Sequence, residues 1–333
     1  MKALVVPEAG RLEIREIPDP QIGPYDALVR NEYCGICNST DTKLIDGKMF
    51  WAPPYPFVLG HESCGTVIET GSKVSRFRIG DRVTRTLAFW PGSHKNLNVA
   101  MGGFAEYGIV RDAVAMAADG DPSLLDDYNT QRQLVVPAGI GPVEAALAIS
   151  LAETASLLRH LPNLRGSKVV VAGTGVAGLA FILWCKLAGA TVISLGRRRE
   201  RLDEALRLGA DLALDTTHGD LVENLRDIGN VDGMIEATGD APFANHLLEA
   251  LSEGGFAAAY GVPPTGVAYD VRRKNLPVEE HLSQAWVCDL LRRGWIKAEW
   301  FISQTWDFSE IITAFDEVRS GRVKKGFVRV GAK

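Results

Sequence analysis

Apolar and polar residues alternate in short segments through roughly the first 145 positions of the chain. Alternation with a period of two, interrupted by glycine and proline, is typical of β-strands that bury one face. The strands predicted in this part are residues 3–6, 26–33, 65–69, 82–86 and 104–110. The pattern therefore predicts a β domain with few helices.

The hydrophobic pattern changes beyond this part of the chain. An apolar-rich helix is expected over residues 143–161, after which strands alternate with helices. The predicted strands are residues 168–172, 191–195, 212–215, 233–237 and 255–260, and the predicted helices are residues 178–187, 199–208, 220–227 and 244–251. Because strand–helix–strand crossovers are right-handed, this series predicts a doubly wound parallel sheet.

The last part of the chain departs from that series. A tryptophan-bearing helix is expected over residues 279–293, an amphipathic helix over 309–320 and a strand over 326–330. This last strand has no partner in the strand–helix series, so we expect it to return to the first domain. The sequence therefore predicts one domain from residues 1–145 and 300–333, and a second from residues 146–299.

A glycine-rich turn follows the first strand of the second domain. Gly173, Gly175 and Gly178 have GxGxxG spacing, which permits a tight turn, close approach of phosphates and packing of the helix on the strand. The N–H groups at the start of the following helix attract a pyrophosphate. The turn thus predicts a dinucleotide site, bound by Gly173, Thr174, Gly175, Val176 and Ala177.

Composition narrows the class of protein. The 333 residues suit two domains, and 46% hydrophobic with 23% charged residues is typical of a globular chain. The net charge of −5 does not favour a nucleic-acid partner. No apolar run reaches the roughly 18 residues of a membrane helix, and the N-terminus does not resemble a signal peptide, so we expect a cytoplasmic protein without a membrane partner. Five cysteines, an odd count, argue against a disulfide scaffold.

A second group of residues carries potential metal chemistry. Cys34 and Cys37 stand in CGIC, Asp41 follows, and His61 and Glu62 stand in GHE. Cysteine, histidine and carboxylate are the usual zinc donors, and a catalytic zinc keeps one position open. Cys37 and His61 are natural ligands, and Asp41 can fix the histidine tautomer. Each residue alone is compatible with a buried structural role, whereas their combination favours a metal site.

Several motifs resemble those of a known superfamily. They are GICNSTD (35–41), LGHE (59–62), GTVIETGSKVSRFRIGDRV (65–83), GGFAEY (102–107), AGTGVAG (172–178), EATG (236–239) and KKGFVRV (324–330). On these motifs the chain resembles the zinc-dependent alcohol and polyol dehydrogenase branch of the medium-chain dehydrogenase/reductase superfamily. The resemblance implies a GroES-like β-barrel catalytic domain and a Rossmann domain with a doubly wound parallel sheet, with the active site between them.

The resemblance also implies roles for single residues. Cys37 and His61 resemble the zinc ligands of the family, and Glu62 resembles an alternate or proton-handling ligand. Thr40 resembles the hydroxyl that relays the substrate proton. This chain has one extra residue between Cys37 and Thr40, which leaves Ser39 as a competing relay hydroxyl.

The chain departs from the family at two zinc positions. Residues 84–101 contain no cysteine where the family carries a structural zinc lobe, so we expect one catalytic zinc and no structural zinc. The usual third catalytic ligand falls at Ile149, which cannot bind metal. Glu153 lies one helical turn further, on the same face, and is the predicted replacement. A carboxylate that serves packing or a salt bridge is the alternative for Glu153.

The end of the second Rossmann strand bears on the choice of nucleotide. Gly196 stands where an NAD enzyme normally has an acidic residue, and Arg197, Arg198 and Arg199 follow. Guanidinium groups bind phosphate bidentately, which favours NADP over NAD. A solvated helix start is the alternative role of these arginines. The resemblance adds three contacts to the cofactor, at Thr238, Gly261 and Val262.

The sequence thus predicts a zinc-dependent oxidoreductase that transfers a hydride between NADP(H) and a secondary alcohol, a polyol or a sugar-derived ketone. Two alternatives stay open. One is a zinc-free reductase of an activated double bond or a quinone, and the other is a non-catalytic nucleotide-binding sensor. The resemblance implies a homodimer or homotetramer, paired through Rossmann edge strands near residues 255–260.

Overall fold

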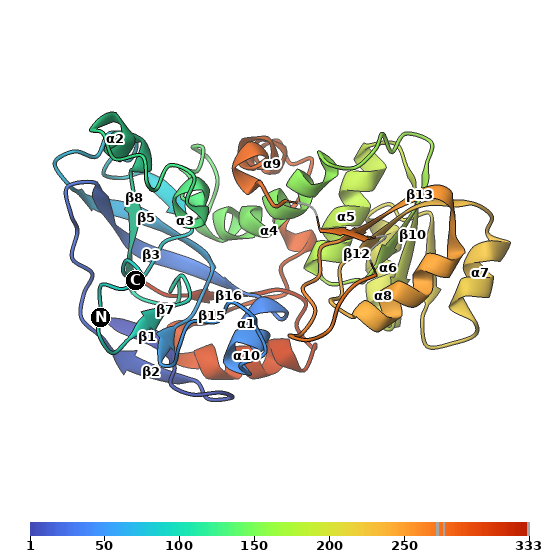
Figure 1. Ribbon diagram of the computed structural model, residues 1–333, viewed down its shortest axis with the longest axis horizontal. Coiled ribbons are helices and arrows are strands. Elements are labelled where there is room, and N and C mark those ends of the chain that lie inside the picture. Colours follow the sequence, from blue (N-terminus) through green and yellow to red (C-terminus); the bar gives the residue numbers. More distant parts are fainter. Residues whose placement is uncertain (271–272, 276, 332–333) are drawn as a thin grey trace. The chain divides into compact units, whose positions relative to one another are not determined.

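The computed structural model describes residues 1–270, 273–275 and 277–331 of the chain. These residues form two compact units (Figure 1). The first unit is Met1–Ile149 with Gln284–Lys333, and the second is Ser150–Ser283. The sequence predicted domain limits after residues 145 and 299. In the structure, the helical segment that starts at Gln284 belongs to the first unit and not to the second.

The first unit is built on two sheets. The smaller sheet has the order β2-β1-β4-β7, and the larger has the order β15-β16-β3-β5-β6, with β8 pairing to β3. Their strands are β1 (Lys2–Val6), β2 (Glu13–Glu16), β3 (Asp26–Ile36), β4 (Phe57–Val58), β5 (Glu62–Thr70), β6 (Arg82–Thr84), β7 (Asn98–Val99), β8 (Tyr107–Arg111), β15 (Gln304–Asp307) and β16 (Gly326–Arg329).

Strand β3 organises the larger sheet because β5, β8 and β16 all pair with it in antiparallel register. Its pairing with β16 places Gly326 opposite Ile36 and Arg329 opposite Tyr33. The last strand of the chain therefore returns to the first unit, as the sequence predicted. Buried apolar side chains of β3, β5, β6 and β8, such as Val29 and Val67, pack in one cluster on this sheet.

Short helices connect the strands of the first unit. They are α1 (Thr40–Ile45), α2 (Ala113–Ala118), α3 (Tyr128–Arg132), α9 (Gln284–Arg292) and α10 (Ile311–Arg319), with the 3₁₀ turns η3 (Ala298–Trp300) and η4 (Phe308–Glu310). The longest helix, α4 (Pro142–Leu158), begins in the first unit and ends in the second. Its apolar character agrees with the predicted helix over residues 143–161, which ends three residues earlier than expected.

The second unit contains one six-stranded sheet in the order β11-β10-β9-β12-β13-β14, in which every neighbouring pair is parallel. The doubly wound prediction is therefore confirmed. The strands are β9 (Lys168–Ala172), β10 (Thr191–Gly196), β11 (Leu212–Asp215), β12 (Val231–Glu236), β13 (Leu251–Ala259) and β14 (Arg273–Asn275). The helical elements are α5 (Val176–Leu187), α6 (Arg199–Arg207), α7 (Leu221–Asp227), α8 (Ala241–Leu247), η1 (Leu248–Ala250) and η2 (Glu280–Leu282).

Sequence patterns missed several short strands. Strands β2, β4, β7, β14 and β15 have two to four residues each, too few to show a period of two. The predicted strand over residues 104–110 begins only at Tyr107, and the predicted helix over residues 279–293 is α9 alone, preceded by a 3₁₀ turn. Strand β13 is not itself the edge of the sheet, because β14 pairs with it, and pairing of subunits through this edge stays a prediction.

The glycine turn after β9 yields a prediction about stability. A Cβ at Gly178 would overlap the carbonyl group of Gly173, whereas a Cβ at Gly175 would meet nothing within 4 Å. We expect Gly178→Ala to lower the free energy of unfolding by about 1–3 kcal/mol, because the helix must move off the strand. Gly175→Ala is the matched control, with an expected change within about 0.5 kcal/mol. Urea denaturation measures both, and equal stability of the two variants would contradict the packing role of Gly178.

Candidate metal centre and nucleotide-binding turn

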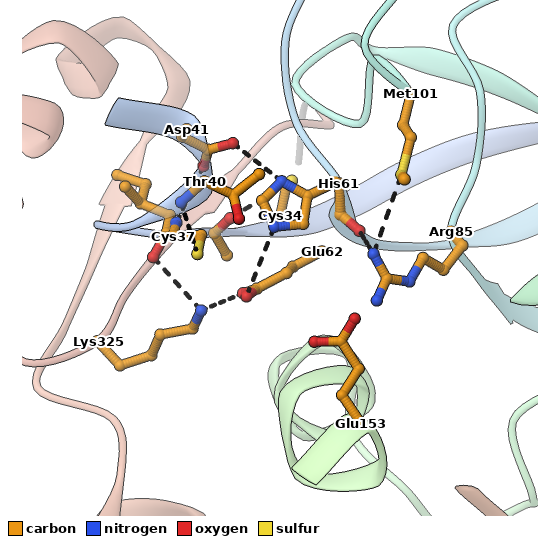
Figure 2. A network of polar contacts seen from close by, with 12 residues as sticks. Cys34, Cys37, Thr40, Asp41, His61, Glu62, Arg85, Met101, Glu153 and Lys325 are labelled. Carbon is orange, nitrogen blue, oxygen red and sulfur yellow. Dashed lines mark hydrogen bonds and ion pairs between the residues drawn. The ribbon is translucent and has the colours of Figure 1, made fainter. Parts of the chain in front are cut away.

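Three donor atoms meet at one end of the larger sheet of the first unit. The ligand atoms of Cys37, His61 and Glu62 all lie within 4.8 Å of one another (Figure 2). Cys37 directly follows β3, and Glu62 begins β5. Because β3 and β5 pair with Gly35 opposite Glu62, the strand register brings these segments together. The sequence-predicted ligands of this unit therefore form one cluster.

Asp41 connects two of these donors. Its Oδ1 accepts a hydrogen bond from His61 Nδ1 at 2.9 Å, and its Oδ2 accepts one from the backbone N–H of Cys37 at 2.9 Å. The carboxylate has no solvent-exposed surface. A histidine that donates through Nδ1 keeps Nε2 as its metal-binding nitrogen. The predicted role of Asp41 in fixing the tautomer thus agrees with the geometry.

The protonation equilibria of the donors reflect this arrangement. Burial lowers the pKa of His61, but the charge of Asp41 and its hydrogen bond raise that pKa well above the usual value. Burial raises the pKa of the Cys37 thiol, and the hydrogen bond and charge of His61 outweigh this, so the net pKa is lowered. Burial together with the charge of Asp41 raises the pKa of Cys34 well above its usual value. Cys37, rather than Cys34, is therefore the thiol suited to act as a thiolate ligand.

Glu62 is held by a residue that the sequence analysis did not single out. Lys325, which is 1% exposed, forms an ion pair with Glu62 Oε2 and also contacts the carbonyl oxygen of Ile36 at 3.3 Å. The other carboxylate oxygen, Oε1, lies 3.9 Å from His61 Nε2. A Cβ at Gly35 would overlap Glu62 Oε2, so a glycine leaves room for the pair. Lys325 lies in the KKGFVRV motif, but nothing in that motif indicates its partner.

The two candidate relay hydroxyls have different surroundings. The backbone N–H of Thr40, the first residue of α1, points to Cys37 Sγ at 3.4 Å. The side chain of Ser39 accepts a hydrogen bond from Lys43 Nζ at 2.6 Å. The Thr40 backbone thus contacts the donor cluster, whereas the hydroxyl of Ser39, the N-cap of α1, is bonded to Lys43 one helical turn further along.

In the second unit, the predicted nucleotide-binding turn has the expected geometry. Gly173 has a φ of +115°, which side chains with a Cβ rarely adopt. Gly175 is the N-cap of α5, and no side chain caps this helix end. A Cβ at Gly173 would also lie 3.0 Å from the Thr238 side chain. The turn therefore opens toward the carboxyl ends of the parallel strands, where doubly wound folds bind their ligands.

The end of β10 lies against the same turn. A Cβ at Gly196 would lie 2.8 Å from Thr174, so these two predicted cofactor residues are neighbours. Arg197 and Arg198 are exposed, and Arg198 is the N-cap of α6. Arg199 is 82% exposed in its side chain and pairs with Asp203 at 3.1 Å, the i,i+4 contact expected of a solvated helix start.

A buried carboxylate arranges the remaining predicted cofactor contacts. Glu236 accepts hydrogen bonds from Thr238 Oγ1 at 2.5 Å and from the Gly239 N–H at 2.7 Å, and it also contacts the Tyr269 hydroxyl. The backbone N–H of Gly261 donates to the Glu236 carbonyl at 3.2 Å. The loops after β12 and β13 are thereby tied together, which places Thr238 and Gly261 at one edge of the sheet, with Val262 next in the chain. The EATG motif alone does not indicate this anchor, because the Tyr269 and Gly261 partners lie outside the motif.

Glu153 lies on α4 in the second unit, one turn after Ile149. Its Oε2 accepts a hydrogen bond from the Tyr260 hydroxyl at 3.0 Å. Ile149 is 1% exposed and belongs to the apolar core. A structural role for Glu153 is thus visible within its own unit, and metal ligation by Glu153 stays a prediction.

Comparisons with known proteins address the family. Residues 23–119 match the family model "Alcohol dehydrogenase GroES-like domain", and residues 176–300 match "Zinc-binding dehydrogenase". An L-threonine 3-dehydrogenase of Sinorhizobium fredii is 30% identical over 284 residues, which cover 81% of this chain and 79% of the relative. The chain belongs to the zinc-type medium-chain dehydrogenase/reductase family. A sorbitol dehydrogenase of Halalkalibacterium halodurans is 27% identical and covers 98% of both chains.

Solved structures agree with this assignment. A zinc-binding dehydrogenase from Sinorhizobium meliloti 1021, solved bound to NADP, is 27% identical, covers 98% of both chains and has a TM-score of 0.79. An alcohol dehydrogenase from Thermus sp. ATN1 covers 99% of both chains with a TM-score of 0.81 and 24% identity, which supports the fold. The GroES-like and Rossmann predictions are confirmed. The chain is a dehydrogenase of the alcohol and polyol type, which disfavours the sensor hypothesis. Among the described residues, no helix is long and apolar enough to span a bilayer.

The link through Asp41 yields a prediction about metal affinity. Asp41→Asn removes one of two acceptor oxygens, so the His61 ring and the Cys37 backbone cannot both be held as they are now. We expect zinc to bind about 10- to 100-fold more weakly, the usual effect of losing such a hydrogen-bond partner. Competition with a chromophoric chelator measures this affinity. Asp46→Asn, on the C-cap of the same helix, is the control that should leave zinc affinity unchanged.

Proposed function

We propose that the protein transfers a hydride between NADP(H) and a secondary alcohol, a polyol or a ketone, including sugar-derived ketones, with one zinc ion held by Cys37, His61 and Glu62. The donor cluster carries this proposal. A thiolate, an imidazole nitrogen and a carboxylate within 4.8 Å of one another form a donor set that suits zinc. The lowered pKa of the Cys37 thiol and the orientation of His61 by Asp41 prepare the set for a cation.

A zinc ion bound there supplies a Lewis acid that polarises the substrate oxygen and lowers the pKa of an alcohol. The chain's own residues orient the zinc ligands and relay the proton of the substrate. Asp41 holds the His61 ring, and Lys325 holds one oxygen of Glu62. We assign the relay of the substrate proton to Thr40, because its backbone contacts Cys37 Sγ, and we keep Ser39 as the second candidate because Lys43 engages its hydroxyl.

The names of the relatives support the substrate class. Curated relatives include L-threonine 3-dehydrogenases and a sorbitol dehydrogenase. The hydroxyl at carbon 3 of L-threonine is a secondary alcohol, and sorbitol is a polyol. We therefore propose a small alcohol or carbonyl compound as the partner in solution. We further propose that the protein is cytoplasmic, has no nucleic-acid partner and forms a homodimer or homotetramer. Sedimentation analysis would test the oligomeric state.

Two observations support NADP over NAD. Gly196 leaves no carboxylate beside Thr174 to repel a 2′-phosphate, and Arg197 and Arg198 stand exposed at the start of α6. Arg199 is the weakest contributor, because its guanidinium pairs with Asp203. The zinc-binding dehydrogenase from Sinorhizobium meliloti 1021, 27% identical to this chain and solved bound to NADP, agrees with this preference.

The nucleotide preference is testable with arginine variants. Losing a charge-assisted hydrogen bond costs about 1.5–3 kcal/mol, so we expect Arg197→Ala with Arg198→Ala to raise the KM for NADP about 10- to 100-fold. The KM for NAD should change little. Arg207→Ala, at the exposed far end of α6, is the matched control. An equal effect of the double variant on both nucleotides would contradict recognition of the 2′-phosphate.

Zinc content tests the metal and the candidate ligand Glu153. We expect one zinc per chain by elemental analysis of protein purified without chelator. Glu153→Gln should lose most of it if Glu153 is a ligand, whereas Glu144→Gln, near the start of the same helix, should retain it. Full zinc content in Glu153→Gln would overturn the ligand role of Glu153 alone.

A parent protein without zinc, even after reconstitution, would overturn the proposed function. Ile149 at the usual third-ligand position would then favour the second candidate, a zinc-free reductase of an activated double bond or a quinone. The donor cluster of Cys37, His61 and Glu62 weighs against that candidate.

A further inference from the structure

Arg85 has an unusual backbone conformation beside the metal centre. Its φ is +59°, and Met101, with a φ of +64°, is the other non-glycine residue with a positive φ in the part of the chain that the structure describes. The left-handed region is costly for residues with a Cβ, and glycine adopts it without strain. Such an outlier persists only where the surrounding structure holds it in place, and strained residues of this kind cluster at functional sites.

Arg85 grips the strand segment that carries two proposed metal ligands. Its backbone N–H donates to the Ser63 carbonyl at 2.9 Å, and its guanidinium Nη1 donates to the His61 carbonyl at 2.7 Å. Glu62 lies between these two carbonyls. One residue therefore holds the main chain on both sides of Glu62, and Figure 2 shows the guanidinium reaching the His61 backbone.

The course of the chain explains why a side chain, and not a backbone N–H, donates to the His61 carbonyl. The β5–β6 ladder pairs Cys64 with Thr84, and β6 ends there. The left-handed turn at Arg85 then directs the chain toward β8, where Leu87 N–H donates to the Ile109 carbonyl at 3.0 Å. Continuation of the ladder would have offered His61 a backbone donor. The guanidinium of Arg85 takes the place of that backbone N–H.

We propose that Arg85 is a positioning residue of the metal centre, which sets the orientation of the His61–Glu62 peptide and through it the placement of both ligands. The proposal rests on the proposed zinc function. Arg85 binds the main-chain carbonyls of His61 and Ser63, on either side of Glu62, so its action passes through the backbone of the ligands.

The surroundings of Arg85 make the grip rigid. The residue is 2% exposed, its carbonyl accepts a hydrogen bond from Gln133 Nε2 at 3.3 Å, and Met101 Sδ lies 3.9 Å from Nη1. Next to it, the Ser63 and Thr86 hydroxyls are hydrogen-bonded at 2.9 Å. The main chain of this segment is thus fixed from several directions, and the Arg85 guanidinium donates to the His61 carbonyl from a held position.

Loss of the guanidinium would leave the buried His61 carbonyl without this hydrogen-bond donor. Because an unsatisfied buried carbonyl is costly, we expect the 61–62 peptide to rotate so that the carbonyl can reach another donor. That rotation would move the His61 ring relative to Cys37. Lysine keeps the charge but not the planar fork of arginine, so Arg85→Lys should preserve the grip only in part.

The test measures metal affinity of the full chain with zinc alone and with Co²⁺ as a spectroscopic probe. We expect Arg85→Met to bind zinc about 10- to 100-fold more weakly than the parent and Arg85→Lys to fall between them. The visible spectrum of the Co²⁺ form should change in the variants, because the ligand geometry changes. Arg132→Met is the matched control, a 6% exposed arginine stacked on Tyr128, whose loss should lower the melting temperature without changing zinc affinity.

Each outcome decides between positioning and mere stability. If Arg85→Met binds zinc as the parent does, and only its melting temperature falls as in Arg132→Met, the positioning role is overturned. If Arg85→Met does not fold, Arg85→Lys decides, and parental zinc affinity with a parental Co²⁺ spectrum would overturn the role. A parent that binds no zinc contradicts the proposed function itself, whereas a zinc-binding parent with unaffected Arg85 variants contradicts this inference alone.

Discussion

The carboxylate of Asp41 is the interaction on which the candidate metal centre depends. It accepts hydrogen bonds from the His61 ring and from the Cys37 backbone. These two residues stand at opposite ends of the segment that connects β3 to β5. A fully buried carboxylate is stable only when its oxygens are satisfied, so its burial requires both partners to stay in place. The hydrogen bonds that satisfy the buried Asp41 carboxylate therefore also hold the Cys37 backbone and the His61 ring close to each other.

Charge balance extends this constraint to the end of the chain. Lys325 and Glu62 are both almost fully buried, and a buried charge without a partner is strongly destabilising. The pair forms only because β16 returns to lie beside β3. Removal of β16 would thus affect the carboxylate donor as well as the sheet. In the second unit, Glu236 is likewise a buried carboxylate that connects distant segments. It accepts hydrogen bonds from the loops after β12 and β13, at the ends of the strands where the glycine turn opens.

Local patterns predicted the parts of the protein that local geometry determines. The GxGxxG spacing predicted the turn, in which Gly173 has a positive φ, Gly175 caps α5, and Gly178 leaves room for the carbonyl group of Gly173. Most of the strand and helix series of the second unit was also predictable, whereas the three-residue strand β14 was missed. Residue type and motif also grouped Cys37, His61 and Glu62 as candidate ligands, and their donor atoms lie within 4.8 Å of one another.

Contacts between distant segments were not predictable in the same way. Lys325 lies 263 positions from Glu62, and only the pairing of β16 with β3 brings them together. The role of Glu236 depends on Tyr269 and on hydrogen bonds to a neighbouring loop, for which no sequence spacing exists. No sequence pattern indicated a role for Arg85. That role depends on its positive φ and on the His61 carbonyl, which accepts a hydrogen bond from the Arg85 side chain and not from a neighbouring strand.

X-ray absorption at the zinc edge of the purified protein tests the central claim most directly. The account predicts a zinc ion with one sulfur ligand at about 2.3 Å, from Cys37, and nitrogen or oxygen ligands at about 2.0–2.2 Å, from His61 and Glu62. Two sulfur ligands would mean that Cys34 also binds the metal, which contradicts the site described above. A protein that retains no zinc under these conditions and after reconstitution would contradict the zinc-dependent mechanism altogether.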